Sequence, residues 1–269
     1  GEEGTGNLRG VRHLFREGGP GRAMGGFISL DGVGLDQVIN QGVGSTRIRI
    51  RLHGPGGHSW TDWGTPNPIH ALGRIVAAME TLPLPSQPRT TATVARVGGG
   101  KSINAIPQEA WMEVDLRSRG KEELQRMEEG LRAVCRREWG NGEEGVTVPP
   151  ALEVEEGVAA PPALEVEEGV AAPLVIEVEE LGRRPAGVTD ANQDLVRAAL
   201  AATRELGVKA TLTASSTDAN LPMSLGIPAI TLGAGGRAGG IHTLDEWYSN
   251  EQGPEGILRA LLILLHLGA

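Results

Sequence analysis

The chain has 269 residues, which is enough for one large domain or two modest ones that each bury a core, and two domains are predicted. Its formal net charge of -9 and isoelectric point near 5.3 argue against a nucleic-acid-binding protein, because such a protein needs a clustered basic face. A single cysteine, Cys135, excludes an internal disulfide framework and predicts a reducing compartment such as the cytoplasm.

No segment has the character of a membrane span. The longest apolar run, residues 257–265, contains Arg259 and is much shorter than the roughly 20 residues that cross a bilayer. We expect this run to form a buried C-terminal helix. The chain opens on glycines and acidic residues instead of an apolar stretch, so we expect no signal peptide and no membrane partner.

The first residues, Gly1-Glu2-Glu3-Gly4, place two adjacent carboxylates between glycines. Each carboxylate is expected to meet a different partner, one of them a candidate metal ion. Apolar residues at helical spacing then predict a helix over residues 8–15, and residues 27–31 predict a short strand. A helix and a strand of this kind are typical of an α/β layer.

Residues 45–184 have the pattern of a separate unit. The predicted elements are, in order, a strand over 46–53, a helix from about Pro66, strands over 90–97 and 111–117, a helix over 121–139 and a strand over 174–178. This βαββαβ order predicts a ferredoxin-like layer, with two helices on one face of a four-stranded antiparallel sheet. The residues expected to face the core are Ile69, Leu72, Val76 and Met79 in the first helix and Leu124, Met127, Leu131 and Cys135 in the second.

A direct duplication interrupts this unit. Residues 149–160 read PPALEVEEGVAA, and residues 161–172 repeat them without change. Two copies are too few for a solenoid. The duplication is interpreted as a hairpin, a mobile surface loop or a pair of edge strands, since loop insertions cost little closure entropy, and an acidic binding repeat is the alternative.

From residue 185 onward, helices and strands alternate. The predictions are a helix from Thr189 or Asp190 to Glu205, a strand over 209–213, a helix over 215–223 and a strand over 227–232. This alternation predicts a mostly parallel sheet, in which ligands gather past the carboxyl ends of the strands. The loop of residues 233–240 has that position, and it leads to His242.

Individually, the candidate functional residues are weak signals. Paired glutamates such as Glu2 and Glu3 are usually solvated, and a loop histidine such as His242 is more often a surface residue than a metal ligand. His58 follows the run Gly54-Pro55-Gly56-Gly57, in which the glycines allow the backbone to approach a ligand closely. It is the combination of these residues that points to a function.

Taken together, these stretches resemble the M20 family of zinc metallopeptidases and amidohydrolases over essentially the whole chain. The segments that carry the resemblance are Gly1-Glu2-Glu3-Gly4 with Gly6-Asn7-Leu8, Gly54–Ser59, Asn104-Ala105-Ile106-Pro107 with Asp115-Leu116-Arg117, Ser216-Thr217-Asp218-Ala219 with Gly226-Ile227-Pro228 and Gly233, and His242-Thr243 with Glu246-Trp247. The resemblance implies an α/β, zinc-peptidase-like catalytic domain with a mostly parallel sheet, interrupted by a ferredoxin-like α+β lid that dimerises. The catalytic domain would comprise residues 1–44 and 185–269, and the lid residues 45–184, including the duplicated insert.

The resemblance also implies a role for each candidate. Glu2 would be the general base, and Glu3 and His242 would each hold one metal of a zinc pair, with cobalt or manganese as alternatives. His58 would reach the partner subunit's active site and donate to the oxyanion, while Asn104 and Arg117 would bind the substrate. A bidentate pair of Arg117 with a carboxylate fits small peptides or N-acyl amino acids as substrates. A structural ion pair of Arg117 with Glu113 or Asp115 is the alternative.

This chain departs from the M20 pattern in one respect. The family's His-x-Asp segment and bridging Asp precede the Glu-Glu motif, and here the chain starts at that motif. We therefore expect it to be the C-terminal portion of a longer hydrolase, inactive as it stands. The rival hypothesis is a non-catalytic dimerisation or peptide-binding protein derived from the same fold.

Overall fold

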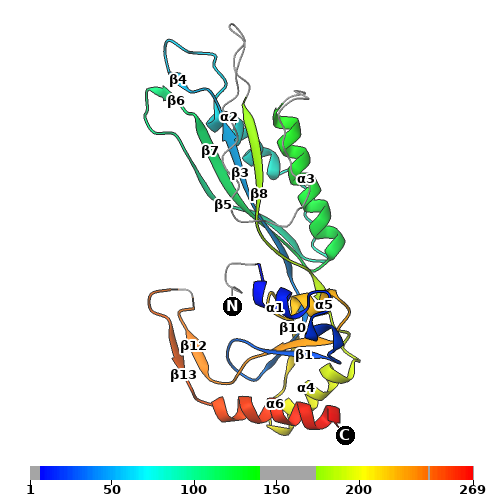
Figure 1. The fold of residues 1–269 in the computed structure, drawn as a ribbon. Coiled ribbons are helices and arrows are strands. Elements are labelled where there is room, and N and C mark those ends of the chain that lie inside the picture. The colour runs from blue at the N-terminus through cyan, green and yellow to red at the C-terminus, as the bar shows by residue number, and fades with distance from the viewer. Residues whose placement is uncertain (1–6, 140–173, 242, 269) are drawn as a thin grey trace.

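The computed structural model describes residues 7–139, 174–241 and 243–268. Figure 1 shows two sheets, one above the other, with the C-terminal helix at the bottom. The predicted general base Glu2, the predicted metal ligands Glu3 and His242, and the duplicated segment 149–172 all lie outside the described residues. The two sheets are named here the upper sheet and the lower sheet.

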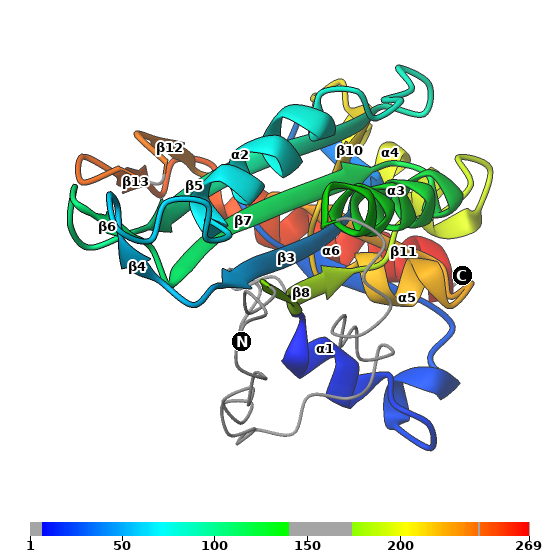
Figure 2. The ribbon, with the colours of Figure 1, turned by 90° about the horizontal axis from the view of Figure 1, so that it is seen from above.

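The upper sheet has the predicted ferredoxin-like topology. Its elements are β3 (Gly44–His53), α2 (Pro68–Met79), β5 (Thr90–Gly99), β7 (Glu109–Ser118), α3 (Lys121–Trp139) and β8 (Val175–Arg184). The strands are ordered β5-β7-β3-β8, and every neighbouring pair is antiparallel. Two short strands, β4 (Gly57–His58) and β6 (Ala105–Ile106), form a separate ribbon beyond the ends of β3 and β7 (Figure 2).

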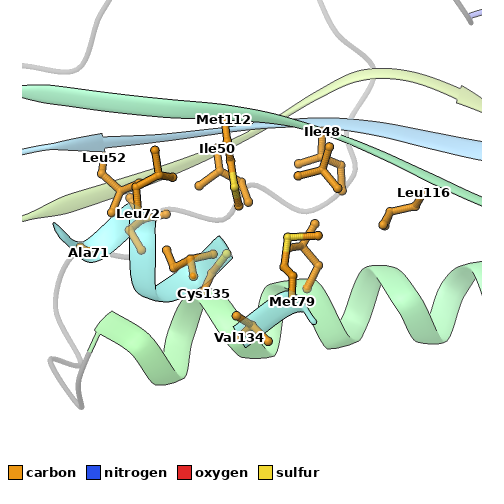
Figure 3. Close-up of a cluster of buried hydrophobic side chains, with 14 of the residues drawn as sticks. Ile48, Ile50, Leu52, Ala71, Leu72, Met79, Met112, Leu116, Val134 and Cys135 are labelled. Atoms are coloured by element: carbon orange, nitrogen blue, oxygen red, sulfur yellow. The ribbon is translucent and has the colours of Figure 1, made fainter. Parts of the chain in front are cut away.

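Alternation along β3 and β7 separates a buried face from an open face. Ile48, Ile50 and Leu52 alternate with arginines in β3, and they are buried against α2 and α3 together with the alternate residues of β7 (Figure 3). The predicted face of α3 is confirmed, since Leu124, Met127, Leu131 and Cys135 are all buried. Burial raises the pKa of the Cys135 thiol to about 12, so this cysteine is an inert core residue.

The predicted face of α2 was partly wrong. Asn67 caps the helix, because its side chain accepts hydrogen bonds from the backbone N–H groups of Ile69 and His70. Ile69 therefore sits in the first turn and is 41% exposed, and Ile75 is buried against the sheet instead. Leu72 and Met79 are buried as predicted.

The lower sheet is mixed, whereas a mostly parallel sheet was predicted. Its strands are β1 (Phe27–Leu30), β2 (Gln37–Gly42), β9 (Gly187–Val188), β10 (Thr211–Ser215) and β11 (Ala229–Leu232). The pairs β1–β11 and β2–β10 are parallel, but β2 is antiparallel to both β11 and β9. The α/β class is confirmed. The sheet is mixed because its two central strands, β2 and β11, run in opposite directions.

Helices cover both faces of the lower sheet. α4 (Asp194–Glu205) and α6 (Gly253–Gly268) pack with Val38, Ile230 and Leu232, while α5 (Asn220–Ser224) packs with Ala229 on the other face. The remaining short helices are α1 (Arg9–Leu14) and η1 (Pro20–Ala23). α4 begins later than predicted, because Asp190 accepts a hydrogen bond from the Asn192 backbone N–H in a turn of its own.

The expectation of a buried C-terminal helix was wrong for most of the apolar residues of α6. Six large apolar side chains are exposed by 43 to 73%: Ile257, Leu258, Leu261, Leu264, Leu265 and Leu267. The buried side chains include Arg259 and Ile263. Arg259 faces inward because its guanidinium donates to the carbonyl oxygens of Leu35 and Gly233. Thus α6 is held by a buried cation together with Leu262 and Ile263, and its other leucines point outward.

A hairpin of β12 (Arg237–Gly239) and β13 (Trp247–Ser249) extends from the lower sheet (Figure 1). Trp247 and Tyr248 in this hairpin are more than half exposed. None of the helices in the described part of the chain has the length and apolar character required to cross a bilayer.

Candidate functional site

His58 and Asn104 are brought together at the tip of the upper sheet. β4 pairs with β6 so that His58 lies opposite Ala105, and the Ser59 backbone N–H donates to the Asn104 carbonyl oxygen at 3.0 Å. The ribbon lies beyond the last pair of β3 with β7, which joins His53 and Glu109. Two residues 46 positions apart in sequence therefore project from one ribbon.

The glycines before His58 are required by close backbone approach. Gly56 has φ of 74°, and a Cβ there would lie 2.6 Å from Cγ of Gln108. Gly57 has φ of 152°, and a Cβ there would lie 2.9 Å from Asp62. Side chains at these positions would push the ribbon away from its supporting loop.

The His58 ring is oriented by its own loop. The backbone N–H of Trp60 donates to Nδ1 of His58 at 3.2 Å, and the His58 backbone N–H donates to the Asp62 carboxylate at 2.6 Å. Because Nδ1 accepts, the proton of the neutral ring resides on Nε2. His58 is thus an exposed N–H donor whose tautomer is fixed by the backbone.

Asn104 is a second donor on the same ribbon. Its side-chain oxygen accepts a hydrogen bond from the Ser102 hydroxyl, which leaves the amide nitrogen as the outward donor. No bond from that nitrogen to another described residue is found in the structure. His58 and Asn104 are therefore two N–H donors at neighbouring positions of the same ribbon.

Two exposed tryptophans lie beside His58 and were not among the site residues predicted from the sequence. Trp60 and Trp63 are each 83% exposed, and Ile103 on the neighbouring loop is fully exposed. Exposed large apolar side chains gathered in one place mark an interaction surface. The sequence feature that could have indicated this surface is the occurrence of two tryptophans shortly after the glycine run, in a chain with only five tryptophans.

Arg117 lies at the opposite end of the upper sheet. It pairs with Ser45 of β3, whereas Ala110, nearer the tip, pairs with Leu52, and the seven residue steps from Ala110 to Arg117 span about 23 Å. Its guanidinium forms an ion pair with Asp115 at 2.8 Å, the structural partner considered as an alternative. The structure therefore does not bring Arg117 together with His58 and Asn104 within one chain.

The open face of the upper sheet carries alternating charges. Glu113 receives hydrogen bonds from Arg49 at 2.6 Å and from Arg96 at 3.0 Å. The hydrogen bond from Arg49 is the main reason that the pKa of Glu113 is lowered, although partial burial opposes it. These pairs stabilise the sheet and engage all three side-chain nitrogen atoms of Arg49 with Glu113 and Glu179.

Replacing Glu113 with glutamine should make the stability of the chain less dependent on acid. A carboxyl whose pKa is lower in the folded than in the unfolded chain stabilises while ionised, and this contribution is lost as pH falls through the folded pKa. In urea unfolding at pH 7, the free energy of unfolding of Glu113→Gln is expected to be about 1 kcal/mol lower than that of the unsubstituted chain. This difference should disappear only below pH 4.5, the ordinary pKa of a glutamate. Glu129→Gln, at an exposed site, should show neither effect; a constant difference at all pH values would contradict the assignment.

The described residues do not supply a metal site. Among them there is no cluster of three or more histidine, cysteine, aspartate or glutamate side chains that could hold a metal. The residues predicted as ligands, Glu3 and His242, lie outside that part of the chain. The predicted zinc pair is therefore a proposal that rests on the family resemblance.

Comparison with known proteins identifies the upper sheet. Residues 41–143 match the family model described as the peptidase dimerisation domain of the M20 type. The chain carries an M20 dimerisation domain. N-acetylcysteine deacetylase of Bacillus subtilis is 32% identical over 92 residues, which are 33% of this chain and 24% of that protein. The predicted resemblance to the M20 family is therefore confirmed.

Solved structures agree with the fold over the whole chain. The aminopeptidase PepT of Bacillus cereus has a TM-score of 0.71 and 18% identity, and the alignment covers 100% of this chain and 63% of that one. A tripeptidase of Staphylococcus aureus has a TM-score of 0.67 and 16% identity, with 97% and 61% covered. Identities this low show the fold alone, and this chain spans less than two thirds of the length of each relative.

Proposed function

We propose that this chain is the C-terminal portion of a dimeric, cytoplasmic M20 hydrolase that cleaves an amide bond in small peptides or N-acyl amino acids. The observation that carries the proposal is the pair of fixed donors, His58 and Asn104, on the tip of an M20 dimerisation domain. The partial coverage of PepT and of the tripeptidase supports the view that the chain is one portion of the enzyme.

In the proposed reaction, His58 and Asn104 hold the carbonyl oxygen of the scissile amide. As that oxygen gains negative charge, hydrogen bonds from Nε2 of His58 and from the Asn104 amide strengthen and stabilise it. Because Nδ1 of His58 already accepts the Trp60 N–H, the ring need not change tautomer during the step. Trp60 and Trp63 would shield an apolar substrate side chain from water.

The distance between Arg117 and the tip that bears His58 and Asn104 supports a site shared by two subunits. Arg117 lies next to the lower sheet of its own chain, whereas His58 and Asn104 lie at the far end of the upper sheet. In a homodimer formed by the dimerisation domain, Arg117 would bind a substrate carboxylate in its own subunit's site. His58 and Asn104 would then serve the site of the partner subunit.

The remaining assignments are carried by the family resemblance. Glu2 would accept a proton from the attacking water and pass it to the leaving amine. Glu3 and His242 would hold the metal ions, which when bound polarise the amide carbonyl. The catalytic domain would comprise residues 1–44 and 185–269, and the lid residues 45–184. Zinc, cobalt or manganese fits the proposal.

The test is metal content and hydrolysis on the longest natural chain that contains residues 1–269. We expect stoichiometric zinc by mass spectrometry, and release of free amine from dipeptides or N-acyl amino acids that a chelator abolishes. A protein with neither metal nor turnover would refute the proposal. Binding of the same peptides without turnover would instead support the rival, a non-catalytic peptide-binding protein.

A further inference from the structure

The chain crosses between the two sheets twice, and the crossings lie side by side. β2 passes into β3 through Val43, and β8 passes into β9 through Pro185 and Ala186. Figure 1 shows the two long strands β3 and β8 running down together toward the lower sheet. Any change in the mutual orientation of the sheets must bend or twist the chain at these crossings.

The ladder of hydrogen-bonded pairs is interrupted at one step. Above it, Ser45 pairs with Arg184, and below it, Gly42 pairs with Gly187. Both pairs are antiparallel, so the crossings form a two-stranded ribbon shared by the two sheets. Between them, the backbone carbonyls of the crossing residues point away from the ladder and need another partner.

Asn220 supplies that partner for both strands. Its side-chain Nδ2 donates to the carbonyl oxygen of Val43 at 2.8 Å and to that of Pro185 at 2.9 Å. Its Oδ1 accepts a hydrogen bond from the backbone N–H of Thr217 at 2.9 Å. The side chain is fully buried, and these three bonds use both amide hydrogens and fix which atom is nitrogen.

The surrounding glycines leave room for this amide and nothing else. A Cβ on Gly42 would lie 2.8 Å from Cγ of Asn220, and a Cβ on Gly44 would lie 2.7 Å from the Ala186 backbone nitrogen. These glycines therefore allow the backbones to approach closely at the step between the two sheets. The hydrogen bonds from Asn220 join both crossing strands to α5, and those from Arg184 to the backbone and hydroxyl oxygens of Ser216 join β8 to the preceding segment.

Asn220 itself begins α5, which packs on the lower sheet. The segment before it is anchored there, because the Val43 N–H donates to the carbonyl oxygen of Ser215 at the end of β10. The hydroxyls of Thr217 and Thr231 also bond at 2.7 Å, which ties the segment to β11. The side-chain amide of Asn220 is thus anchored to the lower sheet and hydrogen-bonded to both crossing strands. It therefore ties the orientation of the upper sheet to that of the lower sheet.

We propose that Asn220 is a positioning residue that sets the angle between the upper and lower sheets. The two hydrogen bonds from its amide close the interrupted step at Val43 and Pro185, and without them the ribbon turns about that step. The tip bearing His58 lies far from the step, so a small rotation there displaces the tip by a large distance. This role is independent of the proposed hydrolysis and would serve a binding protein equally.

The test is the distance between spin labels on the two sheets, measured by pulsed electron paramagnetic resonance in the full chain. Labels at the exposed positions Ala133→Cys in α3 and Arg204→Cys in α4 report the separation, and buried Cys135 stays unlabelled. Asn220→Asp keeps the size of the side chain but removes both donors. We expect its distance distribution to shift in mean and to broaden relative to the unsubstituted chain.

The matched control is Asn40→Ala, which removes a similar bond, from the Asn40 amide to the Thr189 carbonyl oxygen at 2.9 Å, within the lower sheet. This control should lower stability without changing the distance. Circular dichroism establishes that each variant is folded. If Asn220→Asp fails to fold, Gly42→Ala is used instead, because a Cβ at that position displaces the Asn220 side-chain amide. The same shift and broadening of the distance distribution are then expected. A folded Asn220→Asp or Gly42→Ala with an unchanged distribution would overturn the proposal.

Discussion

Replacing His58 with alanine is expected to lower kcat about 100- to 1000-fold, because one oxyanion donor contributes a few kcal/mol to transition-state stabilisation. KM should change little, since the bond to oxygen strengthens mainly as negative charge develops. The measurement is steady-state hydrolysis by the longest natural chain that contains residues 1–269. His70→Ala, at an exposed histidine of α2, is the control and should retain full activity.

A second arm tests whether His58 acts across subunits. Mixing the His58→Ala protein with a Glu2→Ala protein should restore part of the activity, because one site of each mixed dimer then has both residues intact. The restored activity should depend on subunit exchange and vanish when the dimers are cross-linked beforehand. Full activity of His58→Ala by itself would remove this residue from the proposed mechanism.

Replacing Arg259 with leucine is expected to cost about 3 kcal/mol of unfolding free energy, because hydrogen bonds to a buried charged group are among the stronger ones. Arg259 is fully buried, and burial lowers the pKa of its guanidinium. Its loss leaves the carbonyl oxygens of Leu35 and Gly233 unpaired. Urea unfolding measures the global effect.

Hydrogen exchange locates the effect of the Arg259 substitution. The backbone N–H of Gly34 donates to the Gly235 carbonyl oxygen, so faster exchange at Gly34 would show that the loops beneath α6 have loosened. Arg197→Leu, at a side chain 70% exposed, should change stability by less than about 0.5 kcal/mol. Equal unfolding midpoints for Arg259→Leu and the unsubstituted chain would contradict this account.

The upper sheet was predictable because its local signals agree with its tertiary contacts. Alternating residues in β3 and the helical stripe of α3 each point to one buried face, and the element order permits few arrangements. The donor pair of the site was only partly predictable. The pairing of His58 with the Asn104 loop depends on a two-residue ribbon, which leaves no periodic pattern in the sequence.

The lower sheet was less predictable for physical reasons. The reversal of β2 against β11 depends on tertiary contacts that strand patterns do not encode. In α6, apolar residues occupy nearly every position, so periodicity could not show which of them face inward. Arg259 appeared to interrupt an apolar run, yet it is the inward anchor. The position of Arg117 likewise follows from strand register and not from its motif.

The ladder of nine residue pairs between β8 and β3 also explains how the chain tolerates its duplication. α3 ends at Trp139 and β8 begins at Val175, so the repeated twelve residues fall wholly within this connection. By loop-closure entropy, one copy more or less alters the closing free energy by about 0.4 kcal/mol, which is small beside a ladder of this length. The number of copies is therefore nearly neutral for folding, and the segment can vary in evolution without selection on the fold that encloses it.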